Sequence, residues 1–261
     1  MRTLGPFLVG WLILVAASAA QEPNRSQVTL NAKPEAVSVN LQRTAMIVVD
    51  MQNDFAAKGG MFDLAGIDIS PIRKIVPPTA NIISQARKSG IRIIYLKMAF
   101  QPDLSDAGPH DAPNWLKHQR LHIGTANHAP DGSPSRILVR DTWDTDVIDE
   151  LKPGRGDIVI YKHRFSGFYE TELDATLKRL NIKYLIFAGA TTSVCVESTL
   201  RDATFRDYVP VLLADTTAEP IGNGFERTNY EASLLVIQTL FGWVSDSNEL
   251  SRVLSANIVK P

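Results

Sequence analysis

Short, continuous apolar runs recur along the chain, and they constrain its fold more than any other feature. They are residues 44–50 (TAMIVVD), 91–98 (IRIIYLKM), 157–162 (DIVIYK), 183–189 (KYLIFAG) and 209–215 (VPVLLAD). Runs of this length and character are typical of strands that are buried on both faces, as strands in parallel sheets are. Each run is therefore predicted to be a strand of one parallel sheet.

Segments with helical features separate these runs. Gly90 follows the first of them, where a helix C-terminus favours glycine, and Leu173, Leu177 and Leu180 share one helical face. Strands that alternate with helices predict βαβ units, so we expect a single three-layer α-β-α domain with a mostly parallel, doubly wound sheet. The predicted helices are residues 80–90, 144–154, 170–181, 193–207 and 225–241.

The N-terminus has the features of a secretory signal peptide over residues 1–20. Arg2 precedes an apolar stretch, and small residues offer cleavage near Ala19 or Ala20. We therefore expect an exported protein, periplasmic or secreted, with an uncleaved N-terminal anchor as the alternative. Residues 21–42 are predicted to be an N-terminal extension and residues 43–261 the domain itself.

The charge balance and the cysteine count limit the function. The formal net charge is −1, which gives no electrostatic footprint for nucleic acid or for an anionic membrane, so a small molecule is the expected partner. Cys195 is the only cysteine and cannot form an internal disulfide. Its count alone leaves three possibilities open: a buried filler, an intermolecular cross-link or a working thiol.

Three chemically active side chains follow three of the predicted strands. Asp50 ends the first run, Lys162 ends the third, and Cys195 lies a few residues past the fourth, where a helix begins. Because the carboxyl ends of parallel strands meet at one edge of a sheet, where ligands bind, we expect these side chains to lie close together.

These residue types suit acyl transfer. A cysteine thiolate is a nucleophile, and a helix N-terminus and the Lys162 ammonium are expected to lower the pKa of the Cys195 thiol. Asp50 can accept the thiol proton and return it to a leaving nitrogen. The backbone of the GATT segment at 189–192 can supply an oxyanion hole. The sequence therefore predicts a hydrolase that works through a thioester.

Three sequence blocks resemble the isochorismatase-like cysteine hydrolase superfamily. They are IVVDMQNDF, GDIVIYKHRFSGFYETELDATLKRLNI and AGATTSVCVESTLRDATFRDY, and the similarity spans about residues 44–243. The segments RFSGFYET, SVCVESTLRDA and FGWVSD are most similar to ureidoacrylate amidohydrolases, to which biuret and N-carbamoylsarcosine hydrolases are closely related.

The resemblance implies a site and an assembly. It implies that Asp50, Lys162 and Cys195 form a catalytic triad and that the chain forms a dimer or tetramer. It also implies a cis peptide between Ala190 and Thr191, with the Thr191 and Cys195 amides directed at the oxyanion.

Departures from related families narrow the chemistry. The region after the second run has His110 without the Asp-x-His…His metal site of nicotinamidases, so we expect no metal and no cofactor. The presence of Cys195 argues against isochorismatases proper. Glu219 stands where ureidoacrylate-type enzymes have glutamine, which leaves the exact substrate open. The other histidines, His118, His122, His128 and His163, match no compact ligand pattern.

Several polar and aromatic residues near the predicted strand ends are candidates for substrate contacts. Core or interface packing would suit the aromatic ones at least as well, and a role in turns or caps would suit Gln52, Asn53 and Thr171 equally well. The irregular segment 99–140 is expected to be a lid or a binding loop. The candidates are Gln52, Asn53, Phe55, Trp115, Phe168, Tyr169, Thr171 and Glu219.

Together these features predict a metal-independent amidohydrolase that cleaves a C–N bond of a small ureido or amide substrate. The alternatives are a nicotinamidase-like hydrolase, a non-catalytic exported binding protein on the same fold, and a redox-active thiol protein.

Overall fold

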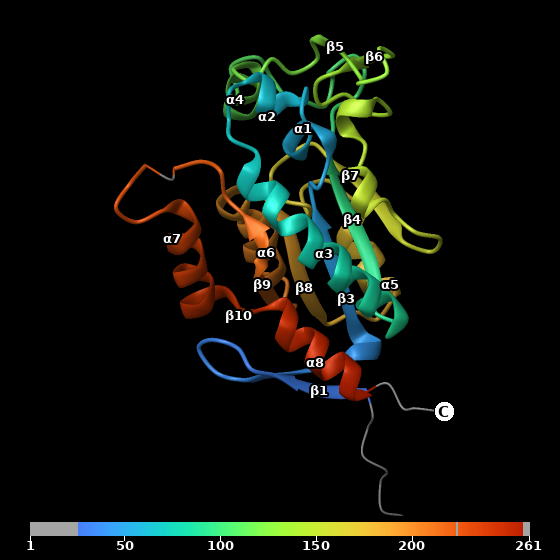
Figure 1. The fold of residues 1–261 in the computed structure, drawn as a ribbon, viewed down its shortest axis with the longest axis vertical. Coiled ribbons are helices and arrows are strands. Elements are labelled where there is room, and N and C mark those ends of the chain that lie inside the picture. Colours follow the sequence, from blue (N-terminus) through green and yellow to red (C-terminus); the bar gives the residue numbers. More distant parts are fainter. Residues whose placement is uncertain (1–25, 223, 258–261) are drawn as a thin grey trace, which may run out of the picture.

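The middle of the molecule is a six-stranded sheet in which every neighbouring pair is parallel, in the order β10-β9-β8-β3-β4-β7 (Figure 1). A computed structural model describes residues 26–222 and 224–257. The five predicted runs are confirmed as strands. The sixth strand of the sheet, β10, was not predicted, because a run of three residues is too short to show a strand pattern. The sheet consists of β3 (Thr44–Val49), β4 (Arg92–Met98), β7 (Ile158–Lys162), β8 (Tyr184–Ala190), β9 (Val209–Ala218) and β10 (Trp243–Ser245).

Helices cover both faces of this sheet and give the expected three layers (Figure 1). On one face, α3 (Ser70–Lys88) and α8 (Ser247–Asn257) pack on side chains such as Met46 of β3. On the other face, α5 (Leu173–Arg179) and α6 (Glu197–Thr204) pack on side chains such as Ile47. Successive residues of β3 thus enter opposite cores, which explains its continuous apolar sequence.

The first predicted helix is much longer than expected. Residues 80–90 are only the end of α3, which begins at Ser70 with Pro71 in its first turn, where the missing N–H of proline costs nothing. Pro77 and Pro78 lie inside this helix. Because proline usually interrupts a helix, the sequence predicted a start after them.

The helix predicted over residues 144–154 is wrong. This segment forms two 3₁₀ turns, Trp143–Thr145 and Asp149–Leu151, with an extended stretch between them. The extended stretch pairs with the backbone that follows β3: Ile148 N donates to Met51 O at 3.0 Å, and Asn53 N donates to Asp146 O at 2.9 Å. These tertiary hydrogen bonds replace the local bonds of a helix.

Two other predicted helices each contain a π-helical turn. Residues 193–207 form the turn Thr192–Val196 and then α6, and residues 225–241 form α7 (Asn229–Val236) and then the turn Ile237–Phe241. Thr228 begins α7 with a capping box.

The remaining elements lie at the two ends of the sheet. The predicted extension forms, from Ser26 onward, a hairpin of β1 (Gln27–Leu30) and β2 (Val37–Asn40) beside α8 (Figure 1). The predicted signal peptide lies outside the described residues. Within the part of the chain that the structure describes, no helix has the length and apolar character needed to span a membrane. The opposite end carries α1 (Asn53–Ala56), α2 (Met61–Leu64), α4 (Pro113–Gln119), β5 (Ala126–His128) and β6 (Pro134–Arg136).

Gly189 is required by the close pairing of β8 with β3. Its φ is +118°, and a Cβ at this position would lie 2.0 Å from Val49 O. We expect Gly189→Ala to lower the free energy of unfolding by about 3 kcal/mol or more, because both the backbone conformation and the space exclude a methyl group. Gly66→Ala is the control, since Gly66 also has a positive φ (+72°) but has open space around it, so only about 1 kcal/mol should be lost. Urea denaturation measures both, and equal losses would contradict the role assigned to the close approach.

Candidate active site

The carboxyl ends of β3 and β7 bring Asp50 and Lys162 into direct contact. Lys162 Nζ lies 2.7 Å from Asp50 Oδ2, and their side chains are 0% and 1% exposed. Asp50 has a left-handed conformation with φ of 49°, which aspartate tolerates better than most residues. Its N–H donates to Leu96 O, and its Oδ1 accepts from Met98 N at 3.0 Å. The end of β4 therefore holds the carboxylate in place.

Cys195 is the third member of this group. It lies in the π-helical turn Thr192–Val196 that directly follows β8, and it is buried. Its thiol lies close enough to Asp50 and Lys162 for both side chains to change its pKa. The structure thus brings together the three side chains that the strand-end argument selected, although they are far apart in the sequence.

Hydrogen bonds join the turn that carries Cys195 to the end of β9. Thr192 Oγ1 lies 2.8 Å from Thr217 Oγ1, and the Ser193 N–H and hydroxyl both donate to Glu219 Oε2, at 2.8 and 2.5 Å. The peptide between Ala190 and Thr191 is cis, as the resemblance implied.

Several amides of this turn are already used. Ser193 N donates to Glu219, while Val194 N and Val196 N both donate to Thr191 O at 3.2 Å. A substrate oxyanion at this turn would therefore have to use the others, among them the Thr191 and Cys195 amides that the resemblance implies.

Burial dominates the electrostatics of the group. Burial raises the pKa of the Cys195 thiol, and the Asp50 charge raises it further, while Lys162 acts in the opposite direction. The expected lowering of this pKa is therefore wrong, because burial outweighs the nearby ammonium. Burial also raises the pKa of Asp50 against the effect of Lys162. Burial alone would lower the pKa of Lys162, but the Asp50 and Cys195 charges outweigh this effect, so the pKa of Lys162 is raised. The resting site is a buried ion pair beside a neutral thiol.

This charge state has a measurable pH dependence. Because the pKa of the Cys195 thiol is raised, we expect alkylation by iodoacetamide to be slow near neutral pH. The alkylation rate should then rise about tenfold per pH unit to at least about pH 9.5, without a plateau. Mass spectrometry is unambiguous here, since the chain has one cysteine. The urea-unfolded protein is the control and should level off near the ordinary thiol pKa. A plateau below about pH 8 in the folded protein would show a lowered pKa instead.

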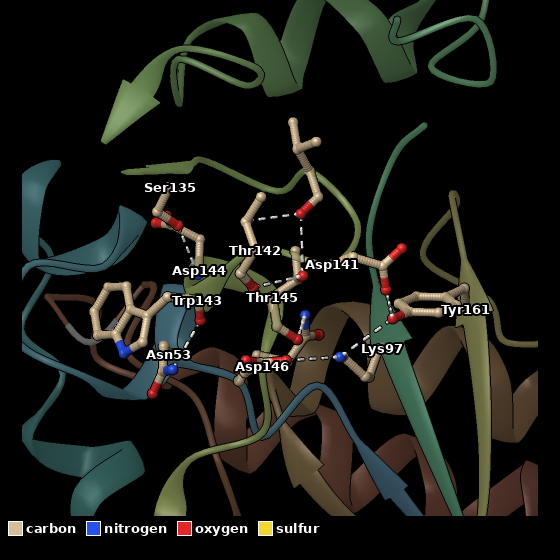
Figure 2. A network of polar contacts seen from close by, with 12 residues as sticks. Asn53, Lys97, Ser135, Asp141, Thr142, Trp143, Asp144, Thr145, Asp146 and Tyr161 are labelled. Carbon is tan, nitrogen blue, oxygen red and sulfur yellow. Dashed lines mark hydrogen bonds and ion pairs between the residues drawn. The ribbon is translucent and has the colours of Figure 1, made fainter. Parts of the chain in front are cut away.

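Three predicted substrate contacts have structural roles. Gln52 is fully buried, and its amide is used by the backbone: Nε2 donates to Met98 O and Thr145 O, and Oε1 accepts from Met98 N. Asn53 Nδ2 donates to Trp143 O at 2.8 Å (Figure 2). Phe55 packs against Phe62 with ring centroids 5.1 Å apart. These residues support the segment after β3 through bonds to the main chain and packing in the core, and Asn53 also lines a cavity beside α1.

The other candidates are spread over the loops around the site. Trp115 of α4 stacks on His110 at 4.2 Å in the predicted lid, Phe168 is buried against Tyr208, and Tyr169 is 45% exposed. Thr171 donates its hydroxyl to Gly167 O as part of a turn. Of the eight candidates, Glu219 is the one that hydrogen bonds to the turn of Cys195.

Two groups that shape the site were not predicted from the sequence. Met98 supplies the N–H bonded to Asp50, and its sulfur lies 3.6 Å from Lys162 Nζ. Thr217 anchors Thr192 and also donates to Gly189 O. Both residues lie at strand ends, and this position is the sequence feature by which they could have been predicted.

The three side chains of the site are buried. A cavity of about 650 Å³ opens beside α1 and the start of α3, lined by Arg73 and Trp143 among others, but it does not reach Asp50, Lys162 or Cys195. Among the described residues, no group of three or more His, Cys, Asp or Glu side chains is arranged to hold a metal ion.

The fold and this grouping define a class, the α/β proteins in which a thiol, a carboxylate and an ammonium meet at the carboxyl edge of a parallel sheet. Within it, the chain belongs to the isochorismatase family: the model of the isochorismatase domain matches residues 44–249. This confirms the family that the sequence blocks indicated.

Curated relatives and solved structures agree with this assignment. The chain is 43% identical to the ureidoacrylate amidohydrolase RutB of Serratia proteamaculans over 229 residues, which covers 88% of this chain and 90% of the relative. It is 41% identical to a RutB of Methylorubrum extorquens, with the same coverage. Its fold is similar to that of a cysteine hydrolase from Pseudomonas syringae pv. phaseolicola (TM-score 0.69, 30% identity, 84% and 95% coverage). It is also similar to N-carbamoylsarcosine amidase from Thermoplasma acidophilum (TM-score 0.57, 25% identity, 79% and 97% coverage).

Proposed function

We propose that the protein is an amidohydrolase that cleaves a C–N bond of a small ureido or amide substrate through a thioester on Cys195. The observation that carries this proposal is the fully buried ion pair between Asp50 and Lys162, 2.7 Å apart, beside the single cysteine. Burying two charges is costly, and such pairs with perturbed pKa values concentrate at functional sites. The names of the curated relatives support a ureido group as the target.

The first half of the reaction transfers an acyl group to sulfur. Because the resting thiol is neutral, Asp50 takes its proton as Sγ attacks the substrate carbonyl carbon. Backbone amides of the turn, those of Thr191 and Cys195, hold the resulting oxyanion. The C–N bond then breaks, and Asp50 returns the proton to the leaving nitrogen. If the substrate is an amide, an acyl thioester remains on Cys195; if it is a terminal ureido group, a carbamoyl thioester remains.

The second half releases the acid. Asp50, again a carboxylate, accepts a proton from water as the water oxygen attacks the thioester carbonyl. The C–S bond breaks and the proton passes to sulfur, which restores the neutral thiol. Lys162 stays protonated, orients Asp50 through their contact and stabilises the negative charge that moves between the carboxylate and sulfur.

Ammonia release from a panel of small compounds tests this function. We expect turnover of at least one ureido compound among ureidoacrylate, biuret and N-carbamoyl amino acids, at a higher kcat/KM than for simple amides. Hydrolysis of nicotinamide alone, lost on treatment with a chelator, would favour the nicotinamidase alternative. Binding of a ureido compound without any turnover would favour a binding protein.

Export and assembly are further parts of the proposal. The N-terminal sequence motivates export with cleavage near Ala19 or Ala20, and the mass of the mature protein from the periplasm or medium checks it. The family resemblance motivates a homo-oligomer, a dimer or tetramer, and light scattering checks it. A full-length mass or a monomeric protein would contradict the respective proposal.

A further inference from the structure

We propose that Glu219 is a positioning residue, which fixes the turn carrying Cys195 and does not itself bind the substrate. Glu219 follows β9 and is 3% exposed. The sequence placed it among the predicted substrate contacts, but it hydrogen bonds to Ser193 in the turn of Cys195 and to Ile221 in the loop after β9. The kinetic part of this inference rests on the proposed function.

The Glu219 carboxylate joins two segments through its two oxygens. Oε2 accepts from the Ser193 N–H at 2.8 Å and from the Ser193 hydroxyl at 2.5 Å. Oε1 accepts from the Ile221 N–H at 2.9 Å. Ser193 lies two residues before Cys195 in the same turn, so the carboxylate ties the nucleophile's turn to the loop after β9.

The partners require an acceptor at both oxygens. A backbone N–H can only donate, so the oxygen facing Ser193 and the oxygen facing Ile221 must both accept. In this chain glutamine cannot make both backbone bonds, because in either orientation its NH₂ group would face one of the two N–H groups; enzymes that have glutamine at this position must hold the turn through other contacts. The lost bond and the donor–donor contact would loosen one side of the connection.

The position of Cys195 depends on this connection. The sulfur must remain beside Asp50 and Lys162, and the turn that holds it is a short segment between the end of β8 and α6. Thr192 and Ser193 are its two side-chain links to the end of β9, through Thr217 and Glu219. Loosening the Ser193 link should therefore move sulfur away from its partners and toward solvent.

A comparison of Glu219→Gln with Asp215→Asn tests this inference. Asp215 is a matched control on the same strand, because it accepts from the N–H and the hydroxyl of Ser247 at 2.8 and 2.5 Å, at the start of α8 and away from the site. Three quantities are measured for each variant on the full chain: kcat and KM for the best ureido substrate, the iodoacetamide alkylation rate of Cys195 at about pH 8, and Tm.

We expect Glu219→Gln to lower kcat by at least about tenfold with KM changed less than about threefold, because a displaced sulfur attacks poorly while the groups that bind the substrate stay in place. Alkylation should become at least about threefold faster, since a more exposed thiol ionises and reacts more readily. Asp215→Asn should leave kcat, KM and alkylation within about twofold of the parent, even if Tm falls.

Other outcomes would overturn the inference. A raised KM with unchanged alkylation would make Glu219 a substrate contact, and an altered Tm with unchanged kcat and alkylation would make it purely structural. If Glu219→Gln does not fold, Ser193→Ala replaces it, since this variant removes only the hydroxyl bond and should change kcat and alkylation in the same directions. The alkylation result stands even if no ureido compound is turned over, which separates a failure of this inference from a failure of the proposed function.

Discussion

Cys195→Ala is expected to lower kcat/KM for ureido substrates by about a thousandfold or more, because no other group in the site can form the covalent intermediate. The fold should persist. The side chain is 7% exposed and its thiol is neutral at rest, so its loss leaves a small gap and no unpaired charge. Initial rates of ammonia release measure the activity, and thermal unfolding measures the stability.

Cys195→Ser is the companion to this variant. Serine keeps a hydroxyl beside Asp50 and Lys162 but ionises far less readily than cysteine, so the serine variant should be nearly as inactive as alanine. Parental turnover by either variant would mean that the sulfur is not the nucleophile.

Asp50→Asn is expected to lower kcat by about a thousandfold or more and to destabilise the protein as well. The variant removes the group that takes the thiol proton, and it leaves the Lys162 ammonium buried without a counter-charge. Loss of one partner of such a pair typically costs about 3–5 kcal/mol. Urea denaturation and initial rates measure the two effects on the same preparation.

The double variant Asp50→Asn with Lys162→Met separates these effects. Methionine removes the unpaired charge, so stability should recover by about 2 kcal/mol or more relative to Asp50→Asn, while activity stays lost. Recovery of activity together with stability would show that Asp50 serves only to neutralise the lysine.

The position of the site could be predicted from sequence because it depends on topology. Parallel strands end at one edge, so Asp50 and Lys162 had to lie on the same rim once their runs were recognised as strands. The apolar pattern of β3 is strong because its successive residues enter two different cores. Both arguments need only local sequence and a general rule of sheet geometry.

Other features depend on contacts that local sequence does not encode. Residues 144–154 have a helical pattern, but the backbone after β3 pairs with them and holds them extended. The helix start beside Cys195 suggested a lowered thiol pKa, whereas the depth of burial, which raises it, follows only from the assembled fold. Glu219 looked like a substrate contact until its bonds to Ser193 and Ile221 were seen.

Covalent chemistry at one sulfur atom is the central claim, and rapid-quench mass spectrometry during turnover observes it directly. With a ureido substrate that the enzyme hydrolyses, acid quenching in the first turnovers should trap a carbamoyl or acyl group on the peptide that contains Cys195, and the adduct should disappear as substrate is consumed. Burst-phase turnover with an unmodified Cys195 peptide, at times when product is already forming, would contradict the thioester mechanism.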